Sequence, residues 1–230
     1  MRTTVTGAVS NPFSTRAVRP GSIQFRFPES DSPDVLLSRL ARRGWWGEII
    51  GPHGSGKTTL LEALVPRLQH VGRHLVRFEL HSGQSSLRPQ RRAATRFARH
   101  QPGELIDAQP PWRHWNKETL VVVDGYEQLS WTSRWWLKTR CRWQQSGLLV
   151  TAHQPTGLPR LLKTQVTREL AHELVRSLLP PECQIIDTKD IDRCFDRHNG
   201  NLRETLFALY DVYEESRAES RESRARGADS

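Results

Sequence analysis

Residues 51–58 have the residue types and the spacing of a loop that binds phosphate. They fit the pattern G-x-x-x-x-G-K-[ST] at every fixed position. The glycines let the backbone curl until successive N–H groups face a phosphate, and a following helix adds the positive end of its dipole. Lys57 can reach the β- and γ-phosphates of a nucleotide, and the Thr58 hydroxyl can ligate Mg²⁺. The predicted nucleotide-binding residues are Gly51, Pro52, His53, Gly54, Ser55, Gly56, Lys57, Thr58 and Thr59.

The segments on either side of this loop support the prediction. The apolar residues Trp46, Ile49 and Ile50 precede it and predict a strand. Leucines at positions 60, 61, 64 and 68 follow it at helical spacing and predict a helix that reaches about His70. We expect Pro66 to bend or break the last turn of that helix. A strand, a glycine-rich loop and a helix in this order are the context in which the pattern binds phosphate.

A second stretch, Thr119–Leu129, predicts the partner of the loop. Its first five residues are continuously apolar apart from the initial threonine, as in a strand buried on both faces of a parallel sheet. Asp124 follows at the carboxyl edge of the sheet, where it can hold Mg²⁺ opposite Lys57. Glu127 is the candidate for polarising an attacking water, and the alternative is a surface glutamate in a loop. The predicted metal ligands are Thr58 and Asp124, and the predicted catalytic residues are Lys57 and Glu127.

Three short motifs resemble those of AAA+ and STAND (NACHT-like) ATPases, over roughly residues 35–215. Asp124–Leu129 looks like the D-G-x-[DE]-x-L form of the second motif in these families. Thr151-Ala152-His153 resembles their sensor T-x-R, with histidine where arginine is usual. Residues 200–204 are similar to the start of a lid helix with a second sensor, which would place Arg203 over the phosphates. The resemblance therefore implies that Thr151, His153 and Arg203 belong to the nucleotide site.

The fold that this resemblance implies is α/β: a P-loop NTPase three-layer sandwich with a parallel sheet and a small C-terminal helical lid. Residues 74–80 predict a strand that lies between the loop strand and the Asp124 strand in the sequence. That arrangement resembles the ATPase branch of P-loop proteins, in which those two strands are not neighbours in the sheet. A GTPase is disfavoured, because position 127 is glutamate where the motif D-x-x-G needs glycine.

The implied function is Mg²⁺-dependent ATP hydrolysis coupled to a nucleic-acid or protein partner, with ATP and Mg²⁺ as cofactors. The alternative is a slow nucleotide-dependent switch or adaptor of the STAND type. A small-molecule kinase is a second alternative. A homo-oligomer also stays open, because an arginine from a neighbouring subunit could complete such a site; the eligible residues are Arg140, Arg142, Arg160 and Arg168.

The sequence predicts four parts along the chain: an irregular leader over 1–22, the ATPase core over 23–170, the helical lid over 171–215 and a disordered charged tail over 216–230. Within the core, alternating apolar residues from Ile23 to Phe27 predict a short strand, and residues 164–170 predict a last one. We expect three helices in the lid, the third beginning after Gly200 with Asn201 as its cap. The tail has no apolar residue larger than alanine.

The composition describes a basic chain of 230 residues with a net charge of +9. This charge favours an acidic partner, with nucleic acid as the first candidate. The segment Arg88–Arg99 contains five arginines, and we interpret it either as a solvated helix face or as a nucleic-acid or acidic-protein contact. The tryptophans of the helix predicted over Ser130–Trp143 are interpreted as core and interface residues, with a base-stacking platform as the alternative.

The location of the protein is predicted from what the sequence lacks. No apolar run approaches the roughly 20 residues that a membrane-spanning helix needs, and the N-terminal residues lack the apolar core of a secretory signal. The three cysteines show no paired spacing, which favours reduced thiols. We therefore expect a cytoplasmic protein without a membrane partner.

Overall fold

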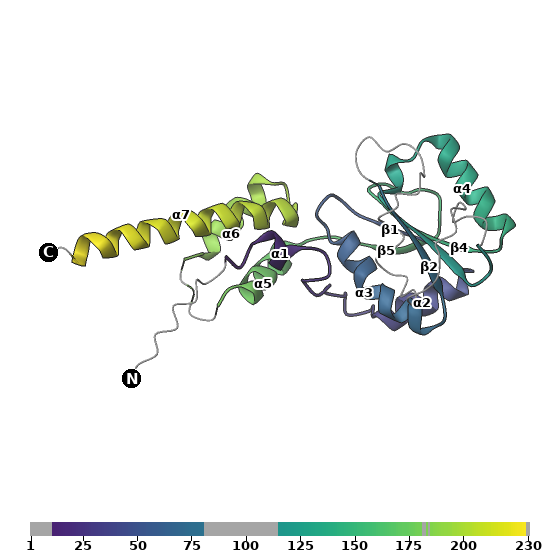
Figure 1. Ribbon diagram of the computed structural model, residues 1–230, viewed down its shortest axis with the longest axis horizontal. Helices are drawn as coiled ribbons and strands as arrows, with labels where there is room; N and C mark the ends of the chain where they lie inside the picture. Colours follow the sequence, from purple (N-terminus) through teal and green to yellow (C-terminus); the bar gives the residue numbers. More distant parts are fainter. Residues whose placement is uncertain (1–10, 81–114, 181–182, 184, 229–230) are drawn as a thin grey trace, which may run out of the picture. The chain divides into compact units, whose positions relative to one another are not determined.

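The computed structural model describes residues 11–80, 115–180, 183 and 185–228 (Figure 1). The contacts divide the chain into two compact units. The sheet unit contains residues 24–52 and 56–164, apart from the segment that is not described. The helical unit contains the described residues up to Ile23 and from Gln165 onward, and His53–Ser55 of the loop group with it. The predicted arginine-rich segment Arg88–Arg99 lies outside the described residues.

The sheet unit is built on a parallel sheet, which confirms the predicted α/β class. Its described strands are β1 (Trp46–Ile50), β2 (His74–Glu79), β3 (Thr119–Asp124), β4 (Gly147–Ala152) and β5 (Arg160–Lys163). They lie in the order β2-β3-β4-β1-β5, and all neighbouring pairs are parallel. Strand β4 therefore separates the loop strand β1 from the Asp124 strand β3, as the sequence predicts. Because all five strands are parallel, Ile50, Asp124 and Ala152 end at the same edge of the sheet.

Helices cover both faces of this sheet, so the sheet unit has three layers (Figure 1). Helices α2 (Pro33–Arg42) and α3 (Lys57–His70) bury their leucines against one face, together with residues such as Leu120 and Leu149. Helix α4 (Trp131–Trp143) covers the other face, where Leu137 and Cys141 pack on Val121 and Leu148. Alternate residues of β3 thus serve the two cores, as the period of a strand requires.

The helical unit contains α1 (Thr15–Val18), α5 (Arg168–Leu178), α6 (Thr188–Arg197) and α7 (Leu202–Ala228) among its described residues. The predicted three helices after the core are confirmed, and so is the Asn201 cap, whose Oδ1 accepts a hydrogen bond from the N–H of Glu204. Phe13 is fully buried in this unit and lies edge-on to Tyr213 at 6.2 Å between ring centroids. The N-terminal segment is therefore part of the helical core rather than a separate leader.

Two of the predicted elements differ at the boundary between the units. The segment 164–170 does not form a strand: β5 ends at Lys163, and Thr167 caps α5 by accepting a hydrogen bond from the N–H of Leu170. The helical unit thus begins at Gln165 rather than at residue 171. Residues 23–27 also form no strand, because Phe25 and Phe27 instead pack edge-to-face on each other and against the core of the sheet unit.

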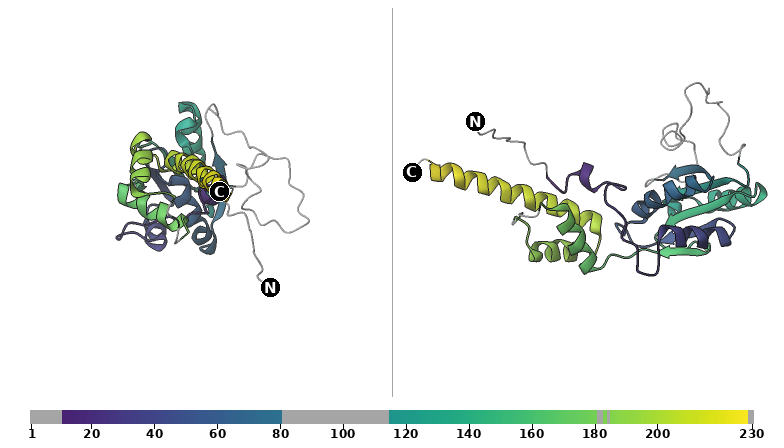
Figure 2. Two further views of the ribbon diagram at one scale, coloured as in Figure 1. Left: turned by 90° about the vertical axis from the view of Figure 1, so that its left-hand side faces the viewer. Right: turned by 90° about the horizontal axis from the view of Figure 1, so that it is seen from below.

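Helix α3 reaches His70 as predicted and has no break at Pro66, whereas α7 is longer than the sequence predicts. Helix α3 continues through Pro66 to His70, so the loss of one backbone hydrogen bond does not end it. Helix α7 continues to Ala228, which contradicts the predicted disordered tail (Figure 2). The tail is rich in Ala, Glu and Arg, which are good helix formers, and extending a nucleated helix costs less than starting one. In the described part of the chain, no helix combines the length and the apolarity that crossing a bilayer requires.

Candidate functional site

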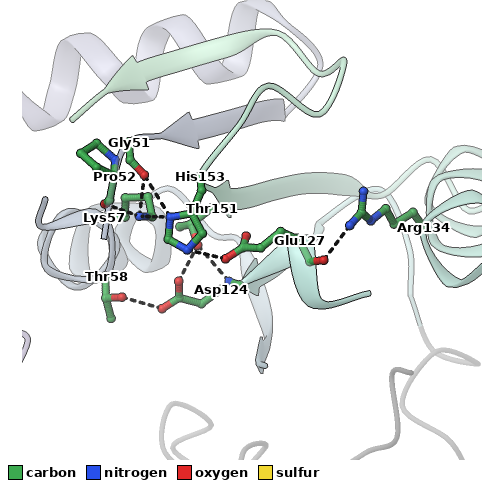
Figure 3. Close-up of polar contacts among 10 residues, drawn as sticks. Gly51, Pro52, Lys57, Thr58, Asp124, Glu127, Arg134, Thr151 and His153 are labelled. Atoms are coloured by element: carbon green, nitrogen blue, oxygen red, sulfur yellow. Dashed lines mark hydrogen bonds and ion pairs between the residues drawn. The ribbon is translucent and has the colours of Figure 1, made fainter. Parts of the chain in front are cut away.

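The loop after β1 holds Lys57 at the start of α3. Gly56 precedes the helix with φ of +86°, a left-handed conformation that glycine adopts without strain. The Lys57 ammonium donates hydrogen bonds to the carbonyl oxygens of Gly51 and Pro52, both at 2.8 Å, and its Nζ lies 3.2 Å from Nδ1 of His153 (Figure 3). Burial lowers the pKa of Lys57, and the negative charges of Glu127 and Asp124 offset part of that effect.

Asp124, at the end of β3, forms hydrogen bonds with residues of α3 and β4. Its Oδ2 accepts a hydrogen bond of 2.8 Å from the Thr58 hydroxyl, across 66 positions of sequence. Its Oδ1 accepts a hydrogen bond from the Thr151 hydroxyl, and Thr151 Oγ1 in turn accepts one from the N–H of Gly125 at 3.0 Å (Figure 3). The predicted residues Thr58, Asp124 and Thr151 are therefore brought together, and hydroxyl groups fix the orientation of the carboxylate.

The chain turns sharply after Asp124 and presents Glu127 to the same edge of the sheet. Gly125 has φ of +83°, and a Cβ at this position would lie 2.7 Å from the carbonyl oxygen of Leu80, so only glycine fits. A short 3-10 turn, Tyr126–Gln128, follows. Arg134 of α4 donates a hydrogen bond of 2.7 Å to the carbonyl oxygen of Glu127, which holds the turn against the helix.

The Glu127 carboxylate contacts His153. Oε1 lies 2.8 Å from Nε2 of the histidine, and the Glu127 side chain is 27% exposed. Oε2 is buried, and among the described residues it has no hydrogen-bond donor. A buried carboxylate oxygen without a donor is uncommon, which marks Oε2 as a candidate functional atom.

His153 connects the two charged groups of the site. With its proton on Nε2, the neutral imidazole donates to Glu127, while Nδ1 accepts from the Lys57 ammonium at 3.2 Å. Nδ1 also lies 3.2 Å from the carbonyl oxygen of Gly51, which the protonated ring could bond instead. Lys57, His153 and Glu127 thus form one chain of polar contacts across the sheet edge.

The sequence analysis missed two buried charged residues that support the site. Arg77 in β2 is 6% exposed in its side chain, pairs with Glu62 and Glu79, and lies 3.7 Å from Oδ2 of Asp124. Glu48 in β1 accepts hydrogen bonds from the N–H and the hydroxyl of Thr156, at 2.7 and 2.8 Å. The signal for both was a charged residue inside an otherwise apolar strand, where burial requires a partner.

The remaining predicted residues are not brought into this cluster by the described contacts. Thr59 lies half-buried in the first turn of α3. His53, Gly54 and Ser55 group with the helical unit, with Gly54 at φ of +69°. Arg203 lies in the first turn of α7, where its guanidinium is 5.7 Å from the ring of Phe207. Their predicted phosphate contacts therefore stay predictions.

The residues at the sheet edge suit a hard cation. Thr58 and Asp124 offer a hydroxyl and a carboxylate oxygen 2.8 Å apart, and oxygen ligands of this kind bind Mg²⁺ together with phosphate and water. Within the described residues, no cluster of three or more His, Cys, Asp or Glu side chains could hold a metal by itself. A metal bound here would therefore depend on ligands from a nucleotide and from water.

Comparison with models of known protein families found no match, and comparison with curated proteins found no relative. What the site does is therefore argued from its own geometry.

Proposed function

We propose that this protein is a P-loop ATPase that binds ATP with Mg²⁺ and hydrolyses the β–γ phosphoanhydride bond. The observation that carries this proposal is the hydrogen bond between Thr58 and Asp124. It joins the end of the glycine-rich loop to the end of a strand two positions away in the sheet. A hydroxyl and a carboxylate paired in this way, beside a lysine at a helix N-terminus, support a Mg²⁺–triphosphate site.

Phosphate binding is assigned to Lys57 and to the N–H groups of the loop. The Lys57 ammonium must exchange its carbonyl partners, Gly51 and Pro52, for phosphate oxygens or share its three N–H groups among them. The lowered pKa of Lys57 reflects burial that an incoming anion would compensate. Thr58 and Asp124 would hold Mg²⁺ beside the phosphates, where its charge would offset theirs.

Water activation is assigned to Glu127. Its Oε2 is buried and has no donor among the described residues, so its acceptor capacity is unused, and a small movement of the side chain would offer this oxygen to a water that attacks the γ-phosphorus. The contact between Oε1 and His153 orients the carboxylate without occupying both oxygens. His153 is therefore a positioning residue in this proposal.

The contact with His153 also supports the alternative of a slow switch. His153 lies at the sensor position where arginine is usual in the families that the sequence resembles, and it holds Glu127 through Oε1. If this contact persists when ATP is bound, Glu127 would be held away from the attacking water. The protein would then act as a switch that binds its partner when ATP is bound. The two functions differ in turnover, not in nucleotide affinity.

Turnover and affinity of site variants test the proposal. In Glu127→Gln the charge that polarises water is removed while size is kept, so we expect turnover to fall by about 10²–10⁴-fold with ATP affinity almost unchanged. In Asp124→Asn a Mg²⁺ ligand loses its charge, so we expect both turnover and Mg²⁺-dependent affinity to fall. The exposed Glu118 provides a matched control, and Glu118→Gln should leave both unchanged.

Two outcomes would contradict this assignment. If Glu127→Gln hydrolyses ATP at the wild-type rate, Glu127 is not the base. If the wild-type protein binds ATP but shows no turnover with or without nucleic acid, the protein is a nucleotide-dependent switch and not a hydrolase.

A further inference from the structure

Helix α4 exposes tryptophans that the sequence analysis interpreted as core and interface residues, with a base-stacking platform as the alternative. Trp131, Trp135 and Trp143 are 79%, 62% and 78% exposed, and Trp136 is 38% exposed. These four make up most of the large hydrophobic side chains that are exposed in the described chain. Several exposed tryptophans on one helix are characteristic of a surface that binds a ligand or a macromolecular partner.

The exposed tryptophans lie in two stripes along α4. Trp131 and Trp135 are four positions apart, and Arg142 lies seven positions beyond Trp135, so these three share one stripe. Trp136, Arg140 and Trp143 share a second stripe by the same kind of spacing, and the exposed Thr132 and Thr139 lie between the two stripes. The opposite side of the helix carries Leu137 and Cys141, which are buried against the sheet. Each stripe therefore combines tryptophan rings with one arginine.

The charge of α4 is entirely positive. The helix contains Arg134, Lys138, Arg140 and Arg142 and no aspartate or glutamate. Arg134 and Lys138 bond backbone carbonyl oxygens, which do not neutralise their charge. The Arg140 guanidinium lies 5.4 Å from the ring centroid of Trp143, and Arg142 lies 5.4 Å from that of Trp46. The first of these pairs places a cation beside an exposed aromatic ring of α4.

We propose that the exposed face of α4, defined by Trp131, Trp135, Trp136, Arg140, Arg142 and Trp143, binds single-stranded nucleic acid. Unpaired bases would stack on the tryptophan rings, and the phosphates would pair with the two arginines. Charge complementarity favours this partner, because the sequence of α4 contains four basic residues and no acidic one, and the whole chain carries +9. A single strand offers flat rings and negative charges together, and the exposed face of α4 offers tryptophan rings and arginines to bind both.

The position of α4 next to Glu127 gives this surface a route to the nucleotide site. The 3-10 turn Tyr126–Gln128 leads directly into α4, whose cap is Ser130. Arg134 of α4 donates hydrogen bonds to the carbonyl oxygens of Glu127 and Leu129. A strand bound on α4 can therefore shift the turn that carries Glu127. This coupling rests on the proposed ATPase function, whereas the binding itself does not.

Fluorescence anisotropy tests the binding in the absence of ATP. The probe is a fluorescein-labelled oligothymidylate of about 20 nucleotides, long enough for the ~4–16-nucleotide sites of single-strand binding folds. We expect Trp131→Ala/Trp135→Ala to weaken binding by about 10-fold or more for each tryptophan. Replacing Arg140 and Arg142 with serine should reduce the slope of log affinity against log salt by about 0.7 for each phosphate that is no longer neutralised.

Three controls make the result specific. Tyr210→Ala, which removes an exposed aromatic ring of the helical unit, should bind the probe as the wild type does. Trp131→Phe/Trp135→Phe should keep much of the affinity, because phenylalanine still stacks. Lys57→Ala should bind the probe normally without ATP, so a failure of the nucleotide-site assignment would not affect this measurement.

Several results would overturn the proposal. One is unchanged affinity in Trp131→Ala/Trp135→Ala, shown by circular dichroism to be folded. A second is no binding of the probe by the wild type at low salt, and a third is equal binding of a duplex of the same length. Self-association that disappears in Trp131→Ala/Trp135→Ala, without any change in probe binding, would identify the face as a protein interface instead.

Discussion

At the scale of single residues, His153 explains the arrangement of the site better than any other side chain. It directly follows β4, which lies between β1 and β3, and it contacts both Lys57 after β1 and Glu127 after β3. The sequence pattern predicts His153 at this edge but offers no reason to pair it with Glu127. That pairing depends on the turn at Gly125, which aims the Glu127 side chain back over the sheet edge.

His153→Ala should lower the turnover of ATP only because the Glu127 carboxylate loses its orientation. We expect a fall of roughly 10-fold, smaller than in Glu127→Gln, because the carboxylate remains but is no longer oriented. ATP affinity should change little. The double variant His153→Ala/Glu127→Gln should be no slower than Glu127→Gln, since the two residues act as one unit. Steady-state ATPase rates of the four proteins check this; effects that multiply would show that His153 acts independently of Glu127.

The residues of the site were predictable where a motif fixes both their type and their place. Lys57, Thr58 and Asp124 followed from the glycine-rich loop and from an apolar strand that ends in a carboxylate. Arg77 was not predictable in the same way, although it pairs with Glu62 and Glu79 and lies 3.7 Å from Asp124. Its partners come from β2 and α3, and only the packed structure brings those elements to the end of β3.

At the scale of elements, the turn between β3 and α4 is the connection that most strictly requires a particular residue, a glycine at position 125. The backbone at Gly125 is left-handed, and the Leu80 carbonyl oxygen lies only 2.7 Å from the position that a Cβ would take. The N–H of Gly125 also donates to Thr151, the hydroxyl that orients Asp124. A change at this glycine therefore affects both folding and the position of the metal ligand.

Gly125→Ala should lower the free energy of unfolding by more than the left-handed backbone alone explains. Gly72 provides the matched control, because its φ is +76° and a Cβ there would have nothing within 4 Å. We expect Gly72→Ala to cost about 1–2 kcal/mol and Gly125→Ala about 1–3 kcal/mol more, since the backbone at Leu80 must also shift. Urea unfolding of both variants measures the difference. Equal costs would mean that the contact with Leu80 is unimportant.

The elements with a strong pattern were predicted, and the short or purely polar ones were not. Strands β3 and β4 are continuous apolar runs, and α3 follows a loop that marks its first residue. Strand β5 has only two buried residues, Leu161 and Leu162, between charged ones, so no periodicity shows. The end of α7 has no apolar face at all, and its composition is shared by helices and by disordered chains.

At the scale of the whole molecule, the strand order was the most informative prediction. The sheet places β4 between β1 and β3, as expected of the ATPase branch that the sequence resembles. The division into units was predicted less well, because Phe13 lies in the core of the helical unit, far in sequence from its partners Leu209 and Tyr213. One aromatic residue in an irregular leader gives no sign of such a distant contact.

Calorimetric titration of the full chain with ATP, in the presence and absence of Mg²⁺, tests the central claim most directly. We predict one binding event that is tightened by Mg²⁺ and weakened about 10–100-fold in Lys57→Ala, the range expected when a charge-assisted hydrogen bond to phosphate is removed. Lys117→Ala, which removes an exposed lysine, should bind as the wild type does. Equal affinity of Lys57→Ala and the wild type, or no binding of ATP by the wild type, would contradict the account.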